Sequence, residues 1–202
     1  MKATSGFFDS QVYGAMALAE TGKALNRAGL LEEARETIAT MLRVQGPRGE
    51  WPWHYDILSG AIIDPYPIFS VHQDGMGPMM LVDVGEALSM DFQPAVERSL
   101  HWVFGDNELN VSLIDEEMKL IWRGIRRKGL SQYALQASRM LHYYEMPALA
   151  QWVNSVPGVT IQYECRPYHL GWALYAFCRR SQLSDFRPAD PVAEGLHVSD
   201  GA

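Results

Sequence analysis

The feature that most constrains the fold is a helical spacing of apolar residues that recurs along the chain. In the segment 30–44, Ala34, Ile38 and Met41 recur every three or four positions, and charged residues occupy the opposite side. This spacing is typical of an amphipathic helix with one buried face. The segment 9–25 has the same period but carries little charge, so we expect it to be buried more deeply.

Two kinds of helical segment alternate. Segments rich in Gly, Ala, Met or aromatics alternate with segments that are charged on one face; the first kind covers 9–25, 74–90 and 167–180, and the second covers 30–44, 93–105 and 132–146. A further helix is expected near 113–128, and 154–164 is considered for a short strand pair. Stacked helical hairpins produce such an alternation. The sequence therefore predicts an all-α fold of about seven helices.

The chain is long enough for one domain with its own core, since it has 202 residues of which 48% are hydrophobic. We expect the helical-hairpin domain to span 1–183. The segment 184–202 is polar and contains prolines, so it is expected to be a flexible C-terminal tail.

Charge and cysteine content exclude several classes of protein. The net charge of −7 argues against a nucleic-acid partner, because phosphate binding needs a basic surface. The basic cluster at 123–128 is interpreted as the solvated end of a helix. No segment reaches the ~18 apolar residues of a membrane-spanning helix, and the N-terminus has no signal-peptide core. Cys165 and Cys178 form no CxxC pair, so we expect a cytoplasmic protein in a reducing compartment.

A short motif follows the charged segment 30–44. The sequence QGPRGEW has the form Q-x3-G-x-W, with Gln45, Gly49 and Trp51 at the specified positions. This motif resembles the repeat signature of the α/α-toroid proteins that include the triterpene cyclases. In that family the glutamine caps a helix end and the tryptophan stacks nearby. The resemblance therefore implies an α/α-toroid-like array and a structural role for Gln45 and Trp51.

Part of the chain is also similar to six-hairpin carbohydrate-active proteins, through the runs WPWHYD…YPIFSVHQDGMGPMML and CRPYHLGWALYAF. The D-x-D-D and D-D-x-x-D motifs of terpene cyclases and synthases are absent from the sequence. A full ring needs about twelve helices, and this chain supplies about half of them at ~1.5 Å per residue. An open arc, a homo-oligomer that completes the ring, and a segment of a longer ancestor are the alternatives.

The segment 49–81 concentrates aromatic and titratable side chains where periodicity is weakest. In a hairpin array the loops that lead into the inner helices share one rim, where helix N-termini favour an anionic ligand. We therefore expect this segment to meet the starts of the helices at 9–25 and 167–180. The candidate substrate-binding residues are Trp53, Tyr55, Tyr66, Gln73, Arg166, Tyr168 and His169.

Two His–Asp pairs are candidate catalytic acid/base groups: His72 with Asp74, and His54 with Asp56. Imidazole titrates near neutral pH, and a carboxylate can hold its tautomer. The alternative for the first pair is that Asp74 is a helix N-cap and His72 a polar loop residue.

Other candidate residues concern ligand binding. An arginine such as Arg166 can bind a carboxylate or phosphate through two parallel hydrogen bonds. Trp53 and Tyr66 can stack on a sugar face or pack beneath the loop. The histidines lack the i,i+4 spacing of a helical metal site, and no Gly-rich dinucleotide loop or serine nucleophile elbow appears, so no metal or cofactor is expected.

These observations predict a saccharide-binding protein. Hydrolase, lyase and epimerase activities on an acidic polysaccharide or uronic-acid sugar are the candidate reactions. A non-catalytic helical scaffold that presents the 49–81 segment to a partner protein is the second hypothesis. An isoprenoid-binding relative of the terpene cyclases is the third.

Overall fold

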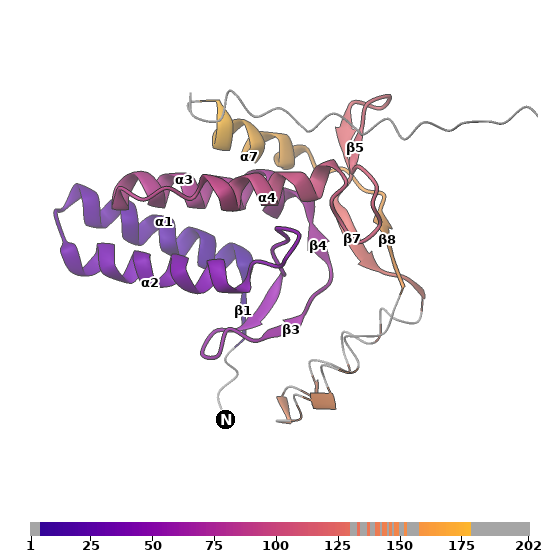
Figure 1. The fold of residues 1–202 in the computed structure, drawn as a ribbon, viewed down its shortest axis with the longest axis horizontal. Coiled ribbons are helices and arrows are strands. Elements are labelled where there is room, and N and C mark those ends of the chain that lie inside the picture. Colours follow the sequence, from indigo (N-terminus) through magenta and orange to yellow (C-terminus); the bar gives the residue numbers. More distant parts are fainter. Residues whose placement is uncertain are drawn as a thin grey trace, which may run out of the picture.

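The computed structural model describes residues 5–129 and 158–178, together with single positions between 133 and 152. Its helices are α1 (Phe8–Ala24), α2 (Ala28–Val44), α3 (Gly77–Leu88), α4 (Gln93–Phe104) and α7 (Pro167–Phe177). A π-helical turn, η1 (His72–Met76), leads directly into α3. Helix α3 packs against α1, α2 and α4, and α7 packs across η1 and α3 (Figure 1).

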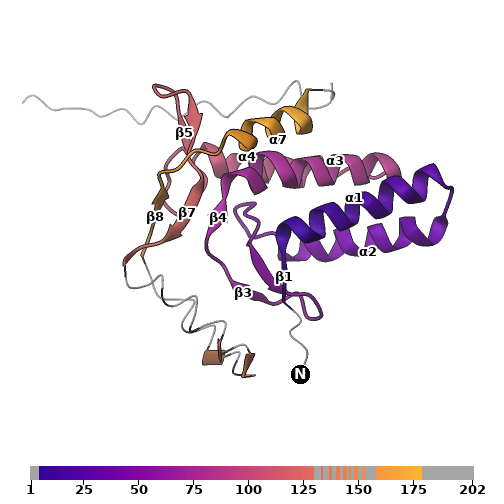
Figure 2. The same cartoon turned by 180° about the vertical axis from the view of Figure 1, so that it is seen from behind.

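Three small antiparallel sheets complete the described fold. The first joins β1 (Ser5–Phe7), β2 (His54–Asp56) and β3 (Ile62–Asp64); the second joins β4 (Ile68–Phe69), β7 (Gly124–Arg127) and β8 (Val159–Gln162); the third joins β5 (Ile114–Asp115) and β6 (Leu120–Ile121). Figure 2 shows the strands gathered at one end of the helical layer. The protein is therefore a mixed α/β protein.

The predicted all-α fold is wrong, and with it the α/α-toroid resemblance. The segment 113–128, expected to be helical, forms β5, β6 and β7 instead. A short apolar run fits a strand as well as a helix, and two positions here disfavour a helix. Lys119 has a φ of 56°, and Gly124 has a φ of 152° with no room for a Cβ beside the carbonyl oxygen of Ile68.

The other periodic segments are helical close to the expected ranges. Helices α1, α2, α3, α4 and α7 begin within a few residues of the predicted starts. Of the strand pair considered at 154–164, the described part is β8, and its partner is the distant strand β7. The helix expected at 132–146 falls largely outside the described residues, and the tail at 184–202 lies wholly outside them.

The main core lies between α1, α2 and α3. Their apolar faces meet there, and the buried side chains include Phe8, Val12, Ala15, Ala34, Ile38, Met41, Met79, Met80 and Val84. A second cluster fills the space beneath the β4–β7–β8 sheet and contains Ile68, Trp102, Val103, Leu113 and Ile125. Among the described residues, no helix is both long enough and apolar enough to cross a membrane.

The Q-x3-G-x-W motif ties elements together although the toroid is absent. Gln45 Nε2 donates to the carbonyl oxygens of Gly49 at 3.1 Å and Ala95 at 3.0 Å. Trp51 is fully buried, and its Nε1 donates to Ser99 Oγ at 2.9 Å. These contacts join the end of α2 to α4, as a structural motif would.

Candidate functional site

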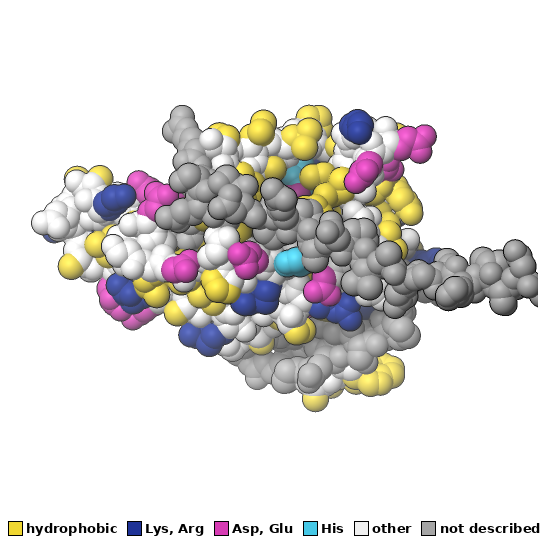
Figure 3. All heavy atoms as spheres, turned by 45° about the horizontal axis from the view of Figure 1, so that its top comes forward, with side chains coloured by type: hydrophobic (Ala, Val, Ile, Leu, Met, Phe, Trp, Pro, Cys, Tyr) yellow, Lys and Arg dark blue, Asp and Glu magenta, His cyan; other side chains and the backbone are white. Residues whose placement is uncertain are grey.

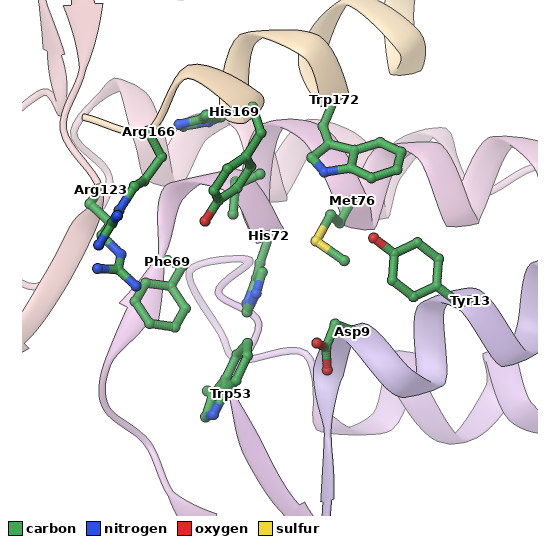
Figure 4. Close-up of a pocket in the computed structure, with 12 residues that line it drawn as sticks. Asp9, Tyr13, Trp53, Phe69, His72, Met76, Arg123, Arg166, His169 and Trp172 are labelled. Atoms are coloured by element: carbon green, nitrogen blue, oxygen red, sulfur yellow. The ribbon is translucent and has the colours of Figure 1, made fainter. Parts of the chain in front are cut away.

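A pocket of about 200 Å³ lies where α1, η1 and α7 meet (Figure 4). Its lining comes from separate parts of the chain: Asp9, Tyr13, Trp53, Phe69, Val71, His72, Met76, Arg123, Arg166, Tyr168, His169 and Trp172. A larger groove of about 370 Å³ runs beside α2, but no cation lines it. Of these two cavities, the first is therefore the one that combines aromatic, basic and titratable groups.

The π-helical turn η1 forms the floor of this pocket. The backbone N–H of Gly77 donates to the carbonyl oxygen of His72, five residues earlier. Such wide turns are rare and often occur at functional sites. Gly75 lets α7 approach, because a Cβ there would lie 2.9 Å from Cβ of Trp172. Asp74 lies inside this turn, so its interpretation as a helix N-cap is wrong.

His72 is held in an aromatic enclosure. Its ring stacks on Trp53 with centroids 5.2 Å apart and an angle of 7°, and Phe69 meets it edge-on at 5.3 Å. Burial, followed by the neighbouring His169, lowers the pKa of His72 to about 3. His72 is therefore a neutral ring near pH 7, and its interpretation as a polar loop residue is wrong because it lies buried in η1.

Asp74 pairs with His169 rather than with His72. His169 Nε2 lies 2.5 Å from Asp74 Oδ1, and both side chains are buried. Burial raises the pKa of Asp74, and the contact with His169 opposes that shift. A carboxylate and an imidazole from positions 95 residues apart thus meet, and the imidazole lines the pocket.

Two guanidinium groups stand at one end of the pocket. Arg123 and Arg166 both bind Oε2 of Glu164, at 2.6 and 2.9 Å. Arg123 also lies over the ring of Phe69, 4.9 Å from its centroid. Figure 4 shows both arginines on one side of His72, with Asp9 and Tyr13 on the other. The pocket is therefore basic at one end, since two cations share one carboxylate.

Glu164 is ionised at neutral pH. Hydrogen bonds from Gln162 and then Arg123 lower the pKa of Glu164 to about 2. Its side chain remains partly exposed, so solvent can reach the carboxylate that the two arginines share.

The second predicted pair, His54 and Asp56, lies away from this pocket. Both residues belong to β2, where His54 stacks on Phe7 at 4.9 Å. Asp56 Oδ1 accepts hydrogen bonds from the backbone and the hydroxyl of Ser59, both at 2.8 Å, which shape the β2–β3 turn. Tyr55 and Asp56 line the groove beside α2 instead.

Two predicted binding residues have structural partners. Tyr66 donates its hydroxyl hydrogen to Glu108 at 3.2 Å, and Arg127 lies over its ring. Gln73 is fully buried, accepts from the backbone N–H of Trp51 at 3.0 Å and donates to the carbonyl oxygen of Phe69 at 3.1 Å. Neither residue lines the pocket.

The predicted residues that line the pocket are Trp53, His72, Arg166, Tyr168 and His169. Their roles in binding or catalysis stay predictions. Sequence reasoning gave no role to Asp9, although it placed this residue at the rim, and it missed Tyr13, Arg123 and Trp172. The one signal for Arg123 was the basic cluster at 123–128. Its interpretation as a solvated helix end is wrong, because Arg127 is buried in β7.

Neither the charge pattern of the surface nor the arrangement of His, Cys, Asp and Glu side chains indicates a second site among the described residues. On the face shown in Figure 3, acidic and basic side chains are interspersed among hydrophobic ones. Within the described part of the chain, no group of three or more His, Cys, Asp or Glu side chains is arranged to hold a metal ion. Comparison with protein-family models, curated proteins and solved structures finds no match to this chain.

Proposed function

We propose that this protein binds a compact anionic small molecule, a ring that carries a carboxylate, in the pocket between α1, η1 and α7. The observation that carries the proposal is the placing of Arg123 and Arg166 at one end of an aromatic-walled cavity. Its volume of about 200 Å³ is below the ~300–1,000 Å³ of sites for drug-sized ligands. A single ring suits this volume better than a polysaccharide chain.

The basic end supports recognition of a carboxylate. Arginine presents a planar set of donors that matches two carboxylate oxygens. Arg166 lies at the N-cap position of α7, and Arg123 precedes β7, so both are anchored to regular structure. Glu164 offsets one of the two positive charges, which leaves one for a ligand.

The aromatic wall supports recognition of a ring. Trp53 and Phe69 line the pocket, and each contacts the other as well as the buried imidazole of His72. Flat apolar faces, including the C–H face of a sugar, pack well on such rings. A uronic acid and an aromatic carboxylate share this chemistry, and the experiment below separates them.

Isothermal titration calorimetry with glucuronate, benzoate, glucose and benzyl alcohol tests the proposal. We expect one of the two carboxylates to bind and its neutral counterpart to bind far more weakly. Preference for glucuronate would identify a sugar acid, and preference for benzoate an aromatic acid. The Arg166→Gln variant should lose roughly ten- to a hundredfold in affinity, because a hydrogen bond to a charged group contributes about 1.5–3 kcal/mol.

Arg126→Gln is the matched control, because Arg126 is exposed on β7 and does not line the pocket. Equal affinities of wild type and Arg166→Gln would contradict the proposal, as would tighter binding of the neutral compounds. An isoprenoid ligand has no support, because a dry hydrocarbon tunnel would not carry Asp9, Arg123 and Arg166. Binding of none of the four compounds, together with a stable dimer in light scattering, would favour the scaffold hypothesis.

A further inference from the structure

We infer that Asp74 and His169 are the proton-transfer element of this pocket: His169 takes a proton from solvent when an anionic ligand binds, and holds it beside that ligand. The inference rests on the proposed function and deepens it. It assigns the proton to a residue for which the sequence predicted only binding, and it excludes His72, which the sequence favoured.

The orientation of the His169 ring supports this assignment. Nε2 contacts Asp74 Oδ1 at 2.5 Å, so one ring nitrogen is engaged on the buried side. The residue lines the pocket, and Nδ1 has no hydrogen-bond partner among the described residues. The backbone N–H of His169 also donates to the carbonyl oxygen of Arg166 at 2.9 Å, which fixes the first turn of α7. Nδ1 is therefore the nitrogen that can exchange a proton with the cavity.

The carboxylate behind the ring makes a charged imidazole acceptable in a buried place. Asp74 is 6% exposed and His169 is 3% exposed, so both are largely shielded from water. A buried imidazolium is costly unless an ionised partner accepts its hydrogen bond. Oδ1 of Asp74 is placed to be that partner. The other carboxylate oxygen of Asp74, Oδ2, has no hydrogen bond among the described residues.

The charges around His169 favour proton uptake when an anion arrives. Asp74 and His72 face the His169 ring from η1, and Asp9 and Tyr13 lie across the pocket on α1. Arg166 and Tyr168 come shortly before His169 in the chain, at the start of α7. Arg123 completes the basic end with Glu164 between the guanidinium groups.

Glu164 offsets one of the two arginines, and a bound carboxylate offsets the other. Asp9 across the pocket and Asp74 behind the ring, when they are ionised, then leave excess negative charge around His169. A proton on His169 compensates for it, so the ligand and the proton stabilise one another.

His72 cannot do the same work. It is packed among the rings of Phe8, Trp53 and Phe69, and its Nδ1 is buried without a hydrogen-bond partner in the described part of the chain. No carboxylate oxygen contacts its ring among the described residues, so a charged His72 would be uncompensated. It can only exchange hydrogen bonds as a neutral ring.

The proton balance is simple. The proton leaves the acid form of the buffer and bonds to Nδ1 of His169, while the hydrogen on Nε2 stays in its bond to Asp74. The buffer is left as its conjugate base, and no other bond forms or breaks.

Calorimetry of glucuronate and benzoate binding in buffers of different ionisation enthalpy measures this uptake. At pH 7.5 we expect the wild type to take up a measurable fraction of a proton per bound ligand. The His169→Gln variant should lose this uptake, and Asp74→Asn should reduce it. His101→Gln is the matched control, because His101 lies on α4 outside the pocket, and it should retain the wild-type uptake. Wild-type uptake in His169→Gln, or none in the wild type, would overturn the inference.

A second measurement needs no ligand and separates this inference from the proposed function. Imidazole nitrogen NMR shifts of the ligand-free protein at pH 7.5 should show a hydrogen on Nε2 of His169 and none on Nδ1. The Asp74→Asn variant should shift the Nε2 signal, with circular dichroism confirming the fold. A hydrogen on Nδ1 of the ligand-free protein would overturn the inference even if a ligand binds. If none of the probes binds but His169 shows this tautomer, the proposed ligand class fails and the assignment of the proton-accepting nitrogen remains.

Discussion

Two carboxylates of this protein are buried beside a basic side chain, and their surroundings differ. Asp64 in β3 lies 3.8 Å from Arg127 in β7, and both side chains are almost fully buried. Asp74 in η1 contacts His169 in α7 at 2.5 Å, and His169 lines a cavity. The first pair joins two sheets, whereas the second joins two helical elements next to space that a ligand can enter.

The comparison shows that a buried charge does not by itself indicate a functional site. A guanidinium keeps its proton at every accessible pH, so the Asp64–Arg127 pair cannot exchange protons with a ligand. An imidazole exchanges protons near neutrality. The cavity and the titratable partner, rather than burial of the carboxylate, distinguish the Asp74–His169 pair.

The largest expected effect comes from making the same substitution in both pairs. Asp64→Asn removes a buried carboxylate 3.8 Å from the Arg127 guanidinium, so we expect it to lower the free energy of unfolding by about 3–5 kcal/mol. Asp74→Asn removes a carboxylate whose burial raises its pKa, and it should change that free energy by about 1 kcal/mol or less at pH 7. Urea denaturation measures both, and equal losses would remove the distinction between the two pairs.

The next effect concerns the acid stability that His72 controls. Burial lowers the pKa of His72 to about 3, below the ~6.5 of an unfolded histidine. The unfolded chain therefore binds the extra proton first. The stability due to a neutral His72 is fully present above pH 6.5 and is lost as the pH falls toward 3.

The His72→Gln variant should remove this part of the acid slope, which amounts to about 1.4 kcal/mol per pH unit in that window. Urea denaturation at pH 4.5, 5.5 and 7 checks it, with His101→Gln as the variant that keeps the slope. An unchanged slope in His72→Gln would show that His72 takes up its proton at the same pH in the folded protein as in the unfolded chain.

The smallest expected effect is on ligand affinity. Glu164 occupies the two guanidinium groups that a ligand carboxylate would use, so it acts as an internal competitor. Glu164→Gln should tighten binding of glucuronate or benzoate a few-fold. Glu117→Gln, in the exposed turn between β5 and β6, is the control. Weaker binding in Glu164→Gln would mean that this carboxylate positions the arginines rather than competing for them.

The sequence predicted individual features of the site better than their pairing. Trp53, His72 and Arg166 were expected at one rim, and all three line the pocket. Local spacing suggested His72 with Asp74, however, whereas Asp74 contacts His169. In a helical turn, side chains two positions apart do not share a face, so His72 and Asp74 point in different directions.

The sequence by itself determined the helices, because a period of three to four residues in apolar side chains is a local property, clear in α1 and α2. Only the tertiary structure decided which short apolar runs became strands. The strand β7 needs β4 on one side and β8, more than thirty residues later, on the other. The same is true of the pocket: Arg123 reaches it from the connection that precedes β7, and His169 reaches Asp74 through packing of α7 on η1. Neither periodicity nor spacing records such long-range contacts.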